Sequence, residues 1–274
     1  MKKLKVGLLV FIFLSITLSL TPAVVPQIGT YTFHGAPGDT KILKINTVNN
    51  ASLNDLFGAG WVNVIESFGP GAANVGARKK SLVTAVNTSH KINYGPFGIY
   101  DGALYNTSNW DWTTGEFSAT PDSIGDVVES FYDPTNLTYI VNAFFASAVT
   151  VQNGAYHLAQ LPTPVAQYLG AIVWAAKWQN VGNTVVHNAD AGDWDSFFTF
   201  QYLEDCTEIW EYDSTYGAWI GYKILDNETN TIYEFSIELA ISEIPGFELS
   251  VFLGITAMTT VGIIYTLMKK KNKK

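Results

Sequence analysis

Cysteine is almost absent from this chain. Cys206 is the only cysteine in 274 residues, so no disulfide can form within the chain. Stability must therefore come from a packed core, which a body of about 220 residues is large enough to build. We expect Cys206 to be a small buried residue of a strand, because no histidine or basic residue stands near it to lower the pKa of its thiol. The alternative is a reactive thiol.

Basic residues are scarce once the two ends of the chain are set aside. The whole chain holds 16 lysines and arginines against 24 acidic residues. Eight of those lysines stand before residue 6 or after residue 268, so residues 24–243 keep 8 basic and 23 acidic side chains, a net charge of about −15. Such a surface repels phosphate groups, which argues against nucleic acid as a partner. It is compatible with cation binding and with solubility outside a cell.

Recognisable catalytic motifs are missing. The sequence has no nucleophile elbow, phosphate-binding glycine loop, paired-histidine zinc helix or cysteine cluster. Its four histidines, His34, His90, His157 and His187, stand far apart and without the spacing of metal ligands. We therefore expect isolated histidines and a protein that is not an enzyme. Histidines that converge only in space would be the alternative.

Long apolar runs, by contrast, stand at both ends of the chain. Residues 249–268 carry no charge and precede a lysine-rich tail, residues 269–274. As a helix this run would span ~30 Å, the thickness of the hydrocarbon core of a bilayer. Residues 1–23, with early lysines and an apolar run over residues 6–20, are typical of a secretory signal peptide cut after Ala23. Because lysine flanks stay in the cytoplasm, the pattern predicts a single-pass protein of the cell membrane whose body, residues 24–243, faces outside.

Residues 244–248 stand directly before the C-terminal apolar run. Pro245, Gly246 and Phe247, followed by an apolar helix and a basic tail, resemble the archaeal sorting signals of the PGF-CTERM kind, including those of Asgard archaea. In that family an archaeosortase reads the signal and removes the helix, and the product can be anchored by lipid. The resemblance covers about the last thirty residues and implies a cell-surface protein. It leaves open whether the helix is kept or cleaved.

The body is expected to be mainly β with a few helices, an α+β domain. Its clearest part is an antiparallel meander, because strands near residues 196–203, 207–213, 218–225 and 231–239 are separated by turns at 213–217 and 226–230. In the last strand Tyr233, Phe235 and Ile237 alternate with polar residues. Further strands are expected near 42–45, 61–65, 82–86 and 139–151. Helices are expected over 53–57 with Ser52 as cap, over 123–131, and from Pro164 to about residue 178.

An acidic cluster is the sharpest polar motif. Asp190, Asp193 and Asp195 stand around a glycine in an expected loop. Closely spaced carboxylates can wrap a hard cation, so the cluster is a candidate calcium site, although it lacks the twelve-residue pattern of an EF-hand. The alternative is an ordinary acidic turn that caps a strand.

Aromatic and basic residues offer two further candidate surfaces. Trp110 and Trp112, among tyrosines and asparagines, could stack on a sugar, although such rings more often pack in a core. Tyr222 and Phe235 would face a hydrophobic ligand if the meander lined a cavity. The triplet at residues 78–80, Arg-Lys-Lys, could bind an anionic partner, and the alternative is a solvated turn.

Five glycosylation sequons are spread along the body, which suits an exported chain. They are Asn50, Asn87, Asn106, Asn136 and Asn227.

Three classes of function follow. The first is a surface-displayed structural or interaction domain without catalytic activity. The second is a module that binds a lipid or another small hydrophobic ligand, since an aromatic meander beside an apolar central segment is similar, by fold analogy only, to the half-open barrels of LolA/LppX-type carriers. The third is a protein that binds or acts on glycans. A wide apolar cavity would favour the second class, and a filled core would favour the first.

Overall fold

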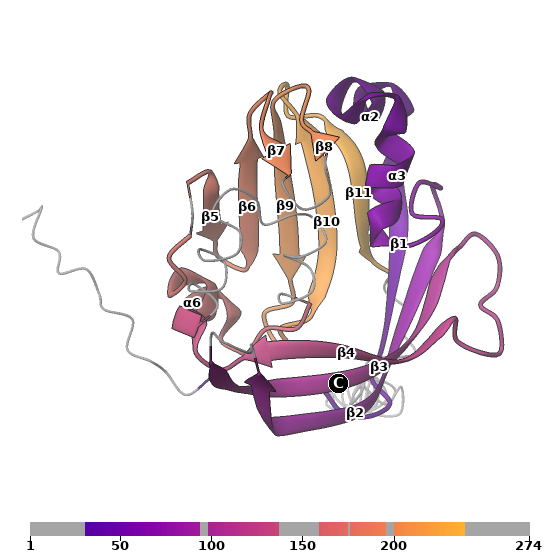
Figure 1. The fold of residues 1–274 in the computed structure, drawn as a ribbon. Coiled ribbons are helices and arrows are strands. Elements are labelled where there is room, and N and C mark those ends of the chain that lie inside the picture. The colour runs from indigo at the N-terminus through magenta and orange to yellow at the C-terminus, as the bar shows by residue number, and fades with distance from the viewer. Residues whose placement is uncertain (1–30, 94–97, 137–158, 175, 196–199, 239–274) are drawn as a thin grey trace, which may run out of the picture.

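The computed structural model describes residues 31–93, 98–136, 159–174, 176–195 and 200–238. Within these residues the protein is mainly β, as the sequence predicts. Nine strands form one antiparallel sheet in the order β4-β3-β2-β1-β11-β10-β9-β6-β5, and β7 pairs with β8 apart from it (Figure 1). The strands are β1 (Thr40–Val48), β2 (Arg78–Asn93), β3 (Ile99–Thr113), β4 (Ser123–Phe131), β5 (Trp178–Val181), β6 (Thr184–Ala189), β7 (Trp194–Asp195), β8 (Phe200–Gln201), β9 (Cys206–Tyr212), β10 (Trp219–Asp226) and β11 (Thr231–Ile237).

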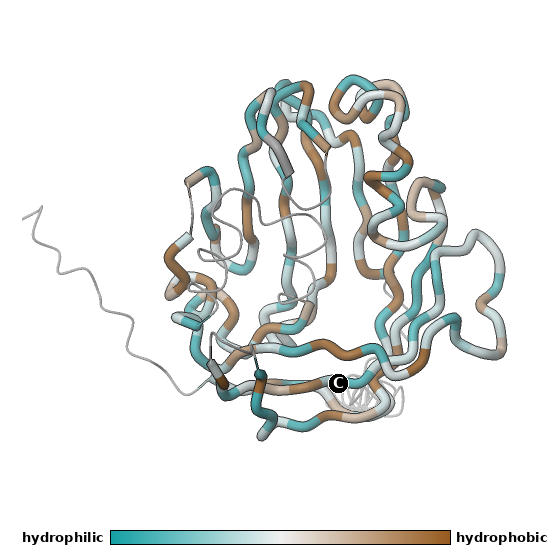
Figure 2. The backbone as a smooth tube through the Cα atoms, in the orientation of Figure 1, coloured by the Kyte–Doolittle hydropathy of each residue, from teal (hydrophilic) through white to brown (hydrophobic). Residues whose placement is uncertain are grey.

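Three of the four predicted meander strands are confirmed. The first, expected near residues 196–203, is wrong: of its described residues, Phe200–Gln201 form β8, which pairs with β7 outside the main sheet, and β6 is the neighbour of β9. β9, β10 and β11 are antiparallel neighbours, and their bounds agree with the prediction to within two residues. Alternation sets which face is buried: in β9, Cys206, Glu208 and Trp210 are buried, whereas Ile209 and Glu211 are only partly covered. Figure 2 shows hydrophobic and hydrophilic residues interspersed along these strands. Cys206 is 4% exposed, and burial raises the pKa of its thiol, so the prediction of a buried strand cysteine is confirmed.

The N-terminal strands β1 to β4 extend the sheet beyond β11. β1 pairs with β11, with Ile45 opposite Phe235, and β2, β3 and β4 follow in order as hairpins. The pairing of β2 with β3 shifts register at three places, and such bulges bend strands and increase their twist. Figure 1 shows β2, β3 and β4 swinging across the foot of the sheet. The nine strands therefore curl around one concave face.

Short helices cover part of this concave face. They are α2 (Asn50–Phe57), η1 (Gly58–Gly60), α3 (Trp61–Ile65) and η2 (Glu66–Phe68). The predicted helix over residues 53–57 is confirmed, but it begins earlier. Its cap is Asn49, whose Oδ1 accepts the backbone N–H of Ser52 at 3.2 Å. The strand predicted over residues 61–65 is wrong: this run is helical, and Ile65 packs into the core at 1% exposure.

Two helix predictions need correction. Residues 123–131 form β4 instead of a helix, with Val127 opposite Asn106 and Val128 opposite Tyr105 of β3. β-Branched residues fit a pleated surface, and pairing with β3 outweighs the helical spacing of the apolar residues. The helix expected from Pro164 to residue 178 is only α6 (Val165–Gly170), and Trp178 already begins β5.

Several predicted segments lie outside the described residues. These are the signal peptide (1–23), the strand at 139–151, the sorting motif (244–248), the membrane span (249–268) and the basic tail (269–274). Within the described ranges, no helix combines the length and hydrophobicity that a bilayer crossing requires.

Candidate functional site

A cavity of about 540 Å³ lies inside the curl of the sheet. Its walls come from β1, β2 and β3 on one side and from β10 and β11 on the other, so it depends on the curvature that brings these strands to face each other. Cavities that hold small ligands measure ~300–1,000 Å³. Exposed Gly35 and Tyr216, which is 42% exposed, also line it and mark where it reaches the surface.

Aromatic rings form the inner part of the cavity. Phe68, Trp112, Trp219 and Phe235 all line it. Their ring centroids lie 5.3 Å apart for Phe68–Phe235 and for Trp219–Phe235, and 5.4 Å apart for Trp112–Phe235. Such packed rings give an apolar surface that retains its shape.

Two lysines face the same cavity. Lys41 stands on β1 in phase with the buried Leu43 and Ile45, and Lys79 on β2 lies directly opposite Leu43, so both side chains are on the concave face. Lys41 Nζ donates to the carbonyl oxygen of Trp219 at 3.1 Å. Lys79 Nζ donates to the carbonyl oxygen of Phe68 at 2.9 Å, which also accepts the indole N–H of Trp112 at 3.1 Å.

The surroundings disfavour the charge of both lysines. Burial lowers the pKa of Lys41 to about 8, and the ammonium of Lys79 adds to this effect. Burial also lowers the pKa of Lys79, while Asp111 and Asp126 oppose the shift. An ammonium group in such a place is most stable beside a negative charge.

The acidic residues that line the cavity are already engaged elsewhere. Asp39 Oδ2 accepts the backbone N–H of Ala36 at 2.7 Å. Asp213 Oδ1 accepts the backbone N–H groups of Thr215 and Tyr216, at 2.9 and 2.6 Å. Glu238 lies 4.0 Å from Lys44 Nζ and 3.8 Å from the Arg78 guanidinium. Within the described part of the chain, no carboxylate lies within 4.0 Å of Lys41 or Lys79.

The structure divides the four ligand-facing residues predicted from the sequence. Trp112 and Phe235 line the cavity. Tyr222 is fully buried in the core, where its hydroxyl donates to Glu208 at 2.7 Å. Trp110 packs apart from the cavity, with Lys80 Nζ 4.6 Å from its ring centroid and its indole N–H donating to Ser118 O at 2.9 Å.

Sequence reasoning missed Lys41 and misplaced Lys79. The basic triplet is the start of β2 instead of a turn, so Lys79 points into the cavity while its neighbour Lys80 points away. For Lys41 a signal was available: this lysine precedes Leu43 and Ile45 at the spacing of the buried face of a strand.

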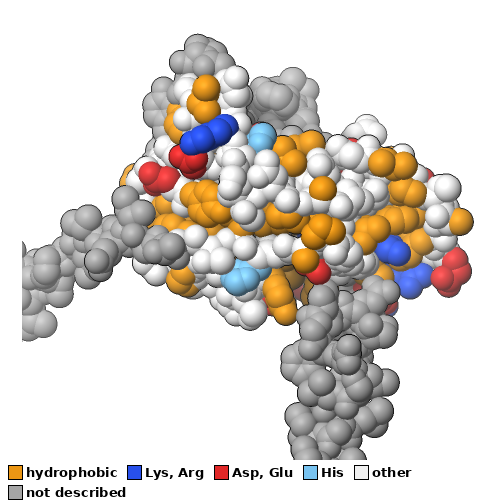
Figure 3. All heavy atoms as spheres, turned by 90° about the horizontal axis from the view of Figure 1, so that it is seen from below, with side chains coloured by type: hydrophobic (Ala, Val, Ile, Leu, Met, Phe, Trp, Pro, Cys, Tyr) orange, Lys and Arg blue, Asp and Glu red, His pale blue; other side chains and the backbone are white. Residues whose placement is uncertain are grey.

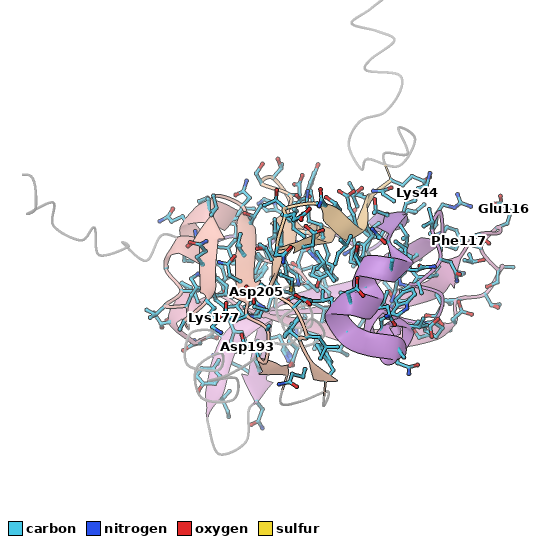
Figure 4. The ribbon with its side chains drawn as sticks, turned by 90° about the horizontal axis from the view of Figure 1, so that it is seen from above. Lys44, Glu116, Phe117, Lys177, Asp193 and Asp205 are labelled. Atoms are coloured by element: carbon cyan, nitrogen blue, oxygen red, sulfur yellow. The ribbon has the colours of Figure 1, made fainter. Side chains whose placement is uncertain are left out.

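The candidate calcium cluster has a different partner in the structure. Lys177 Nζ lies 2.8 Å from Asp190 Oδ2 and 2.6 Å from Asp193 Oδ2 (Figure 4). The side chain of Asp195 is outside the described part of the protein. Among the side chains that are described, no group of three histidines, cysteines or carboxylates could hold a metal ion. The lysine charge takes the place that a cation would have between the first two carboxylates.

The histidines are distributed over the fold. His187 on β6 and Glu208 on β9 form a buried pair at 2.8 Å, and Tyr202 and Tyr222 also donate to this carboxylate. His90 lies 2.8 Å from Glu129, and His34 bonds Thr163 at 2.8 Å. His157 is outside the described residues.

The predicted glycosylation sites differ in accessibility. Asn50, Asn87 and Asn227 are exposed, whereas Asn106 and Asn136 are half-buried.

Comparison with protein-family models, with curated proteins and with solved structures finds no match for this chain.

Proposed function

We propose that the curled sheet is a binding module that holds a small hydrophobic or amphiphilic molecule, displayed on the outer side of a membrane. The observation that carries the proposal is the cavity of about 540 Å³ with its inner surface of aromatic rings. A purely structural domain would be expected to fill such a space with side chains, because unfilled apolar volume destabilises a fold.

The surroundings of the cavity support the same function. The rest of the concave face is tightly packed, with Tyr222, Tyr233 and Ile45 at 0% exposure, so the open space is local and bounded by a firm core. The space-filling view from below shows hydrophobic side chains in a band across the underside of the molecule (Figure 3). An apolar ligand that approaches such a surface would contact hydrophobic side chains there.

The display part of the proposal rests on the two ends of the sequence. The apolar run over residues 249–268 and its lysine tail favour a single span, and Pro245-Gly246-Phe247 favours recognition by an archaeosortase-type enzyme. With the body outside, the cavity would meet molecules of the cell envelope or the surroundings.

The binding function is tested by filling the cavity. Val83 on β2 lines it, and Val83→Trp would occupy part of its volume, whereas Thr84→Trp adds the same ring at an exposed position of the same strand. The full-length chain is exposed to hexadecanol bearing a photoreactive diazirine in its chain, and labelled peptides are identified by mass spectrometry. We expect labelling at cavity residues in the wild type and in Thr84→Trp, and its loss in Val83→Trp. Labelling that is equal in all three proteins would refute the proposal.

A further inference from the structure

We propose that the cavity selects amphiphiles with a negatively charged head group, a carboxylate or a phosphate, bound between Lys41 and Lys79, with the alkyl chain on the aromatic surface beyond them. This inference rests on the proposed binding function and specifies its ligand class.

Most basic residues of the acidic body already have a partner. Five of the 8 basic residues between the two chain ends have a carboxylate within 4.0 Å: Lys44, Arg78, Lys91, Lys177 and Lys223. A sixth, Lys80, lies over the ring of Trp110. The remaining two, Lys41 and Lys79, both line the cavity. Lys41 Nζ lies 5.9 Å from the centroid of the Trp219 ring, and in the described part of the protein neither lysine has a carboxylate within 4.0 Å. Acidic residues outnumber basic ones by 15 in residues 24–243, yet these two ammonium groups form no ion pair within the described residues. Asp111 and Asp126 act on Lys79 only from beyond ion-pair distance.

The register of β1 and β2 places the two lysines close together. Lys41 lies opposite Ser81 and Lys79 lies opposite Leu43, so the two lysines are diagonal neighbours on one face of an antiparallel pair. Diagonal positions lie ~7–8 Å apart, within reach of long side chains. Burial lowers the pKa of both lysines, and the charge of Lys79 lowers that of Lys41 further. One anion between them removes both penalties and accepts hydrogen bonds from both groups.

Both lysines lie next to the aromatic surface of the cavity. Each ammonium group donates to a backbone carbonyl of a residue that lines the aromatic surface, Lys41 to Trp219 and Lys79 to Phe68. The charged and apolar parts of the cavity are therefore adjacent. Gly69 packs against this junction: its φ is +120°, which favours glycine, and a Cβ there would lie 3.1 Å from Lys79 Nζ. A ligand that fits both parts has an anionic head next to an apolar tail.

The test uses three photoreactive probes with the same sixteen-carbon chain and different ends: hexadecanoate, hexadecyl phosphate and hexadecanol. Each is titrated against the full-length chain in a non-ionic detergent, and the concentration that gives half-maximal labelling of cavity peptides is measured. The variants are Lys41→Met with Lys79→Met, and the control Lys80→Met, which removes a charge from the same strand but on the opposite face. Retained labelling by hexadecanol in the double variant shows that its cavity is intact.

We expect the double variant to weaken labelling by at least one anionic probe ~10-fold or more, since charge-assisted hydrogen bonds are lost. Hexadecanol labelling and the Lys80→Met variant should stay within about twofold of the wild type. A response confined to hexadecanoate would identify a fatty-acid-like ligand, and one confined to hexadecyl phosphate a phosphate-bearing lipid. If all three probes label the cavity and the lysine substitutions change none of them, binding stands and this inference is wrong. If no probe labels it, the proposed function fails as well.

Discussion

The position of Lys41 in the fold determines the environment of its charge. In the sequence it is one basic residue of an acidic chain, and in the fold its side chain occupies the buried phase of β1. A charge held there destabilises the empty protein, because the lysine loses water without gaining a carboxylate. Such a residue is retained most easily where a ligand supplies the missing charge.

The first prediction concerns the stability of the ligand-free protein. Since the pKa of Lys41 is lowered to about 8 in the fold and is ~10.4 in an unfolded chain, the folded state binds fewer protons between these values. The free energy of unfolding should therefore rise as pH increases from about 8 to 10, through this residue alone. Lys41→Met should be more stable than the wild type at pH 7 by ~1 kcal/mol, and the difference should shrink toward pH 10. Urea unfolding of both proteins at several pH values measures it, and a variant less stable than the wild type at pH 7 would contradict the assignment.

Glu208 is the opposite case, a buried charge whose partners are all present. Its carboxylate accepts from His187 at 2.8 Å, Tyr222 at 2.7 Å and Tyr202 at 3.3 Å, and the residue is 0% exposed. Together these bonds link β6, β9 and β10 with the segment before β9.

The second prediction follows from these bonds. Glu208→Ala leaves buried donors without an acceptor and should destabilise the protein by ~3 kcal/mol or more. Glu211→Ala, on the outer face of the same strand, removes only a surface ion pair with Lys223 and should cost under ~1 kcal/mol. Chemical denaturation of the two variants compares them directly. Equal losses would show that the buried network adds little.

At the scale of elements, β2 shows why strand phase matters more than local composition. Residues 78–80 are uniformly basic in sequence, which suggested a single solvated or anion-binding patch. Because successive side chains of a strand point to opposite faces, Lys79 lines the cavity and Lys80 lies over the ring of Trp110 on the other face. Two neighbouring lysines therefore have different environments.

The helical cover gives the third prediction. α2 carries Leu53, Leu56 and Phe57 into the core, and its N-terminus is held by the side chain of Asn49. Asn49→Ala removes the acceptor for the Ser52 N–H and should lower stability by ~1 kcal/mol. Asn54→Ala, at an exposed position inside the same helix, deletes the same amide without removing a cap and should be neutral or slightly stabilising. Thermal denaturation separates the two, and a larger loss for Asn54→Ala would contradict the role of Asn49.

At the scale of the molecule, the decisive feature is that the two ends of the body meet. β1, which begins at Thr40, pairs with β11, which ends at Ile237, and this pairing joins the N-terminal hairpins to the C-terminal meander in one curled sheet. The cavity lies where the two halves face each other, so neither half could form it alone.

The fourth prediction concerns where this molecule resides. We expect the full chain, made in its native host, to sediment with membranes because of its C-terminal apolar run. A chain ending at residue 243 should be released in soluble form outside the cell, whereas removal of residues 269–274 alone should leave it membrane-bound. Fractionation and immunoblotting measure all three. A full-length chain recovered as a soluble cytosolic protein would refute the predicted topology.

Much of the fold was predictable because some signals are local. Period-two alternation and clear turn residues identified β9, β10 and β11, and a short apolar run next to good capping residues identified α2. Residues 61–65 and 123–131 were assigned to the wrong class because short apolar runs fit either element, and the choice depends on which neighbour they pack against. The long hairpin of β2 and β3 went unrecognised, since bulges interrupt its alternation.

The sequence by itself determined the mainly β character, the meander, the absence of disulfides and the acidic balance of the body, because alternation, cysteine count and charge are properties of residues in order. Only the tertiary structure decided that Lys41 and Lys79 share a cavity with Trp112 and Phe235, and that Lys177 joins Asp190 and Asp193. These groups come from strands and loops far apart in the chain. Their meeting depends on the curvature and register of the whole sheet, which no short stretch of sequence encodes.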